Sequence, residues 1–139
     1  LCIHGEQHGL VGEEYFDAEI YDEKLGRVNT VPLMQSNLQQ FEERKWVVPI
    51  LANANSIESS WGTELGLLFI DGSHTEVSAM NDYDNWSSKL HSHGALVIHD
   101  IYEEPEDGGQ APYLVYQKAQ KEGFKLFERV DTIVCLTKA

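Results

Sequence analysis

The fold is decided by residues 66–100, which read GLLFIDGSHTEVSAMNDYDNWSSKLHSHGALVIHD. Two short apolar runs, 66–70 and 94–98, each stop at polar residues, as buried parallel strands do where they meet a turn. The segment between them has helical spacing, so we predict a strand–helix–strand unit. Ligands bind beyond the carboxyl ends of parallel strands, and the polar side chains there should converge. These side chains are Asp71, His74, His99 and Asp100.

The connecting segment also predicts where its helix begins and which face it buries. Ser73 and Glu76 have the S-x-x-E spacing of a capping box. An apolar stripe at helical spacing follows, and it favours plain core packing. The stripe consists of Val77, Met80, Tyr83, Trp86 and Leu90.

The flanking segments extend this unit into an α/β domain. The predicted strands are 1–3, 46–51, 66–70 and 94–98, followed by an antiparallel hairpin of 124–130 and 132–137. Further helices are predicted at 32–44, 56–61 and 112–122, with Gly123 as the stop of the last. Pro49 favours a position near the sheet edge for its strand. Residues 4–12, 13–22 and 103–109 are predicted loops.

Composition favours one globular domain and excludes some partners. The chain has 139 residues, of which 42% are apolar, enough to fill a core. With 23 acidic and 10 basic residues (formal charge −13), it would be repelled by nucleic-acid phosphates. No apolar run approaches the length of a membrane span. Cys2 and Cys135 lack the spacing of a disulfide framework, which favours a reducing, cytoplasmic location.

Residues 66–102 resemble the class I S-adenosylmethionine-dependent methyltransferases, especially the small-molecule O-methyltransferase branch with F-I-D-G-S-H and H-D strand ends. The closing hairpin is also typical of that family. The resemblance implies a Rossmann-like, doubly wound, mostly parallel sheet in a single domain over residues 1–139. The family's first strand and its Gly-rich loop are absent from this sequence, so we expect an N-terminally incomplete domain lacking the first strand.

The resemblance also implies cofactor and metal contacts. S-adenosylmethionine is the implied cofactor, and the implied metal ligands Asp71, His99 and Asp100 would hold a divalent cation, for which carboxylate oxygens suggest Mg²⁺. The family's ribose-binding acid is replaced near His4, and Glu6 is the nearest carboxylate. The cofactor-binding candidates are His4, Glu6, Asn53, Ala54, Asp71, Gly72 and Ser73.

Methyl transfer to a hydroxyl group requires that its proton be removed or weakened. An aryl hydroxyl has an ordinary pKa of about 10 and is mostly protonated at neutral pH. A divalent metal lowers that pKa, and a histidine such as His74 accepts the proton as a general base. Both mechanisms stay open at this point. The catalytic candidates are His74, Asp71 and His99.

Each candidate also has a plain structural interpretation. An Asp-Gly pair such as Asp71-Gly72 is common in strand-to-helix loops, and Asp100 can cap a turn. His74 lies inside the predicted capping box, where it can be a solvated first-turn residue. The acidic segment 103–107 is a solvated loop or a lid.

Two other functional classes share the predicted architecture. A phosphoacceptor signalling module could use Asp71, but it also needs an early acidic pair and a late strand-end Lys, and neither is present. A nucleotide-binding oxidoreductase needs a G-x-G-x-x-G turn, which residues 1–139 lack. A non-catalytic domain is a third alternative. We expect a small-molecule acceptor as partner, no nucleic acid and no membrane, and leave homo-oligomer formation open.

Overall fold

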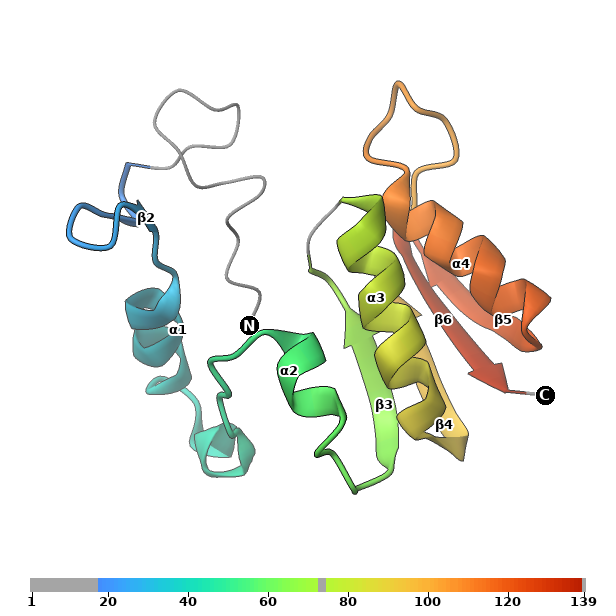
Figure 1. Ribbon diagram of the computed structural model, residues 1–139, viewed down its shortest axis with the longest axis horizontal. Coiled ribbons are helices and arrows are strands. Elements are labelled where there is room, and N and C mark those ends of the chain that lie inside the picture. Colours follow the sequence, from blue (N-terminus) through green and yellow to red (C-terminus); the bar gives the residue numbers. More distant parts are fainter. Residues whose placement is uncertain (1–17, 73–74, 139) are drawn as a thin grey trace. The chain divides into compact units, whose positions relative to one another are not determined.

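The computed structural model describes residues 18–72 and 75–138 (Figure 1). The chain divides into two compact units, residues 1–52 and 53–139. The predicted strand at 1–3 lies outside the described residues.

The second unit is built around a four-stranded sheet of order β3-β4-β6-β5. Strands β3 and β4 run parallel, whereas β6 runs antiparallel to both β4 and β5. This arrangement confirms the strand–helix–strand unit, the closing hairpin and the mixed α/β class. The elements are α2 (Ala54–Glu58), β3 (Leu65–Ile70), α3 (Glu76–Trp86), η2 (Ser87–Lys89), β4 (Leu90–Ile98), α4 (Ala111–Lys121), β5 (Phe124–Val130) and β6 (Ile133–Lys138).

Helices α3 and α4 lie side by side on one face of the sheet (Figure 1). Side chains alternate along β4, where Leu96 and Ile98 are fully buried and Val97 between them is only partly buried. Fully burying one such leucine or isoleucine stabilises the fold by about 2 kcal/mol. The buried core consists of Ile70, Ala79, Tyr83, Leu90, Leu96, Ile98, Ile101, Ala111, Val115, Ala119, Phe124, Val134 and Leu136.

The buried face of α3 differs in part from the predicted stripe. Tyr83 is fully buried, and Met80 packs against the core as predicted. Val77 was predicted to be buried, but it is 72% exposed, and Ala79 is buried instead. Ala79 and Tyr83 are four residues apart and share one helix face, so the sheet meets that face rather than the one carrying Val77.

The cap of α3 also lies later than predicted. Thr75 is the N-cap, and its hydroxyl accepts a 3.4 Å hydrogen bond from the backbone N–H of Ser78. The helix thus begins later than the predicted capping box requires, and Glu76 is its first residue. Ser73 itself lies outside the described residues. A carboxylate in the first turn still interacts favourably with the positive end of the helix dipole.

Strand β4 begins at Leu90, four residues earlier than predicted. The pairing of β4 with β3 is irregular at the start of the two strands. Leu65 pairs with Leu90 but Leu67 pairs with Ala95, so β4 has a bulge of extra residues between these two pairs. Gly94 is needed there, because a β carbon would lie 3.0 Å from the carbonyl oxygens of both His91 and Leu65. The glycine therefore permits the close approach of the two strands.

Helix α2 begins at Ala54, two residues before the predicted start. The side chain of Asn53 accepts a 2.9 Å hydrogen bond from the backbone N–H of Asn55 and caps the helix. At the other end of the unit, Gly123 follows α4 with φ of +99°, as the predicted helix stop requires.

The first unit contains no strand at 46–51, where one was predicted. Residues 42–46 form a short 3-10 helix, η1 (Glu42–Trp46), and 47–51 have no regular structure. Pro49 has no N–H for a strand ladder, and Trp46 and Val48 are each 79% exposed. An apolar run alone therefore did not make a strand.

The predicted helix over 32–44 is shorter than expected. It is α1 (Val31–Leu38), and Phe41 has an extended backbone (φ −110°, ψ 138°) that separates it from η1. Ahead of it lies a small antiparallel hairpin, β1 (Tyr21–Asp22) and β2 (Arg27–Val28), and β1 falls at the end of the predicted loop 13–22. No helix among residues 18–72 and 75–138 is long and apolar enough to cross a membrane.

Candidate functional site

The parallel pairing of β3 and β4 brings the ends of the two strands together. Ile70 and Ile98 are register partners, and the backbone N–H of His99 donates a 3.1 Å hydrogen bond to the Ile70 carbonyl. Asp71 therefore follows one strand where His99 and Asp100 follow its neighbour. Three of the four side chains predicted to converge do so: one ligand atom from each of Asp71, His99 and Asp100 lies within 4.8 Å of the others. The fourth, His74, lies outside the described residues.

Two short distances define this acid–histidine cluster, by which we mean Asp71, His99 and Asp100. Nδ1 of His99 lies 2.9 Å from Oδ1 of Asp100 and 3.4 Å from Oδ1 of Asp71. Asp71 is the most exposed member, and Asp100 is the least exposed at 19% of its side-chain surface. The cluster thus opens to solvent on the Asp71 side.

The backbone leaves strand geometry at the cluster. In a regular strand, consecutive side chains point to opposite faces, which would separate His99 from Asp100. Asp100 instead has φ of +59°, a left-handed conformation that costs about 1 kcal/mol for residues other than glycine. The next residue, Ile101, is buried, and its N–H donates a 2.9 Å hydrogen bond to the carbonyl of Thr132. This anchor stabilises the turn that places the Asp100 carboxylate beside the imidazole.

The imidazole nitrogen that faces the carboxylates is poorly satisfied. Nδ1 of His99 is shielded from solvent and makes no well-aligned hydrogen bond with any residue that the structure describes, despite its closeness to Asp100. The ring is also fixed from the side by Phe69, with centroids 6.5 Å apart in an edge-to-face arrangement.

These features fit a divalent cation. Ligands about 2.1 Å from a cation and at right angles to each other lie about 3.0 Å apart. The two Nδ1–oxygen distances, 2.9 and 3.4 Å, are close to that value. A cation between them would also give the shielded nitrogen the partner it lacks. The donor set is thus two carboxylates and one imidazole.

The part of the chain that carries this cluster matches a known protein family. A family model described as a methyltransferase domain matches residues 7–101. The chain belongs to this family of methyltransferase domains. The match includes β3, α3, β4 and all three members of the acid–histidine cluster, and it ends at the buried Ile101.

Of the remaining predicted site residues of this methyltransferase domain, some are described by the structure and others are not. Gly72 directly follows Asp71 at the end of β3, and Ala54 opens α2. Asn53 is exposed, and its side chain caps α2. Four other candidates lie outside the described residues. They are His4, Glu6, Ser73 and His74.

The acidic loop after β4 is held at its base. The Gln110 side chain donates hydrogen bonds to the carbonyl oxygens of Tyr102 (3.1 Å) and Gly108 (3.2 Å). Glu103 pairs with Arg129 at 2.7 Å. No sequence motif marks Gln110 or Arg129, because their partners are distant in sequence or are backbone atoms.

Proposed function

We propose that this domain transfers a methyl group from S-adenosylmethionine to a hydroxyl group of a small molecule, as in the O-methyltransferase branch. The supporting observation is that Asp71, His99 and Asp100 converge at the carboxyl ends of two parallel strands, inside the family match. Ligands of open, doubly wound α/β sheets bind at such strand ends.

The cofactor would lie beside this cluster. Asn53 and Ala54 are proposed to contact the adenine, and Asp71, Gly72 and Ser73 to form one wall of the cofactor site. His4 and Glu6 are proposed to take the place of the family's ribose-binding acid. The adenosine contacts and the acceptor contacts would then come from different residues, apart from Asp71.

In the proposed reaction, the acceptor oxygen forms a bond to the methyl carbon while the bond from that carbon to sulfur breaks. The sulfonium becomes a neutral thioether, and the hydroxyl proton must leave to a base. A divalent ion bound by Asp71, His99 and Asp100 would lower the pKa of a nearby hydroxyl. His74, or His99 where no ion is bound, would accept the proton.

The experiment is methyl transfer from S-adenosylmethionine carrying a radiolabelled methyl group to a panel of phenols, catechols and sugar hydroxyls. We expect a labelled ether product from at least one acceptor, and a loss of about 10²-fold or more in turnover for Asp71→Asn. Glu106→Gln is the matched control, because Glu106 is an exposed acid outside the cluster. Labelling of amines only would contradict the O-methyltransferase assignment.

A further inference from the structure

We infer that the acid–histidine cluster selects a transition-metal divalent ion such as Mn²⁺ over Mg²⁺. The inference rests on the proposed role of the cluster as a cation site. It replaces the expectation of Mg²⁺, which considered only the carboxylates of Asp71 and Asp100. The new element is the position of His99, whose Nδ1 lies 2.9 Å from an oxygen of Asp100 and 3.4 Å from an oxygen of Asp71.

The type of donor decides the selectivity. Mg²⁺ binds oxygen ligands, retains several waters and dehydrates reluctantly. Imidazole nitrogen is instead a good ligand for first-row transition metals, while carboxylate and water also suit Mn²⁺. Distances do not separate the two ions, because both fit the 2.9 and 3.4 Å spacings. A site that must use nitrogen as one of three protein ligands therefore favours the transition metal.

The geometry indicates that His99 is a ligand and not merely an ion-pair partner. A hydrogen bond from an Nδ1–H group to Asp100 would need good alignment, and the 2.9 Å contact lacks it. A metal-bound Nδ1 carries no proton, and its lone pair would bind the cation that the two nearby carboxylate oxygens also reach. The ring of Phe69 packs against the imidazole in an edge-to-face arrangement and restricts its rotation. The imidazole nitrogen and the two carboxylates therefore already lie close enough together to bind one cation.

The test is metal binding by the full chain, measured calorimetrically with MnCl₂ and MgCl₂ at about pH 7.5, where a free imidazole is mostly neutral. Mn²⁺ is the better probe than Zn²⁺, because the exposed His91 and His93 offer Zn²⁺ imidazoles elsewhere. We expect Mn²⁺ to bind at least about ten times more tightly than Mg²⁺.

The informative variant is His99→Asp, which leaves only oxygen donors. The preference for Mn²⁺ over Mg²⁺ should fall by about tenfold in this variant. The matched control is His93→Asp, which makes the same change at an exposed position of β4 and should keep the wild-type preference.

A spectroscopic measurement on the wild type does not depend on how the variants fold. Electron spin-echo spectra of the Mn²⁺-loaded chain should show the coupling of one directly bound ¹⁴N nucleus. Absence of that coupling, equal affinity for the two ions, or no Mn²⁺ binding would each overturn the inference. None of these readouts uses the cofactor or an acceptor, so failure of the methyl-transfer proposal is detected separately.

Discussion

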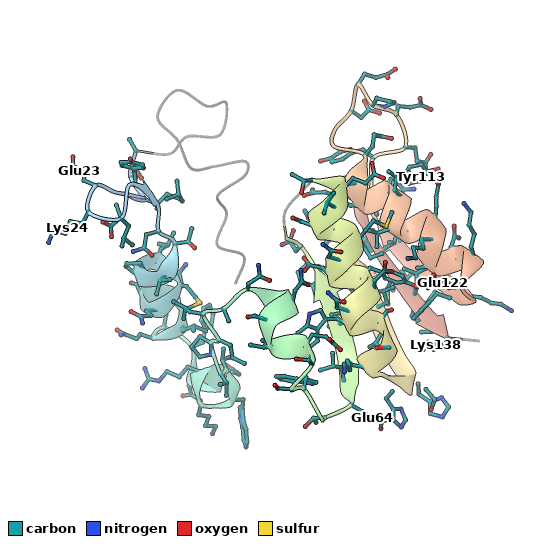
Figure 2. All side chains as sticks on the ribbon, in the orientation of Figure 1. Glu23, Lys24, Glu64, Tyr113, Glu122 and Lys138 are labelled. Carbon is teal, nitrogen blue, oxygen red and sulfur yellow. The ribbon has the colours of Figure 1, made fainter. Side chains whose placement is uncertain are left out.

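The hydroxyl of Tyr83 on α3 donates a 2.7 Å hydrogen bond to the carboxylate of Glu122. Glu122, labelled in Figure 2, directly follows α4. The two residues are 39 positions apart, so this bond ties the two helices that cover the sheet. The same helices are joined by an ion pair between Lys118 and Asp84, which raises the pKa of Lys118. Tyr83 also meets Phe124 edge to face, with centroids 6.4 Å apart.

Tyr83→Phe should lower the free energy of unfolding by about 1 kcal/mol, the usual net value of one intramolecular hydrogen bond. The ring stays buried, so packing is preserved and only the hydroxyl is lost. Denaturant unfolding followed by circular dichroism measures the change. Tyr116→Phe is the control, because its hydroxyl accepts an exposed bond from Gln120 within α4. An equal loss in both variants would contradict the role of the Tyr83 bond.

The same tyrosine predicts how stability depends on alkaline pH. Burial raises the pKa of Tyr83 strongly, and the hydrogen bond to the Glu122 carboxylate raises it further. The folded state therefore keeps the proton that the unfolded state releases above its ordinary pKa of about 10. Stability from this group is fully present below about pH 10 and falls as the pH rises above it. Unfolding midpoints at pH 9 to 11 should fall less steeply in Tyr83→Phe than in wild type.

Core packing predicts a larger effect at Leu96, which is fully buried in the middle of β4. Leu96→Ala should destabilise the fold by about 2–5 kcal/mol, because it removes buried methyl groups and leaves a cavity. Leu67→Ala makes the same change on the neighbouring β3, where the side chain is 56% exposed. Its cost should be under about 1 kcal/mol. Comparable losses would contradict the assigned sheet faces.

Gly108 lies under the ring of Tyr102, and a β carbon there would be 2.4 Å from a ring atom. Gly108→Ala should therefore displace the ring or the loop and cost about 1–3 kcal/mol in thermal unfolding experiments. Gly62→Ala is the control, because nothing lies within 4 Å of its added methyl group. An unchanged melting temperature for Gly108→Ala would show that Tyr102 moves freely.

Local signals predicted the second unit well. The strands at 66–70 and 94–98, the hairpin and the stop at Gly123 were predicted because apolar runs, turn residues and tertiary packing agree there. The convergence of Asp71 with His99 and Asp100 followed from one topological rule for parallel strands. The direction of the His99 ring did not, because it depends on the left-handed backbone of Asp100 and on contact with Phe69.

Predictions failed where a single local signal stood alone. The apolar run at 46–51 contains a proline and does not pair, so hydrophobicity was not sufficient for a strand. Val77 fits the helical period but lies on the face turned away from the sheet. The predicted N-cap, Ser73, was two residues too early, because the N-cap is Thr75. Both residues carry a hydroxyl that can cap a helix, and the sequence alone does not show which of them does so.

The central claim is that the cluster at the ends of β3 and β4 carries out proton and acceptor chemistry, while other residues bind most of the cofactor. The most direct measurement compares wild type with Asp100→Asn, recording methyl transfer and S-adenosylmethionine affinity in the same preparations. We predict that Asp100→Asn reduces turnover by about 10²-fold or more and changes cofactor affinity by less than about threefold. Full turnover by Asp100→Asn would contradict the account.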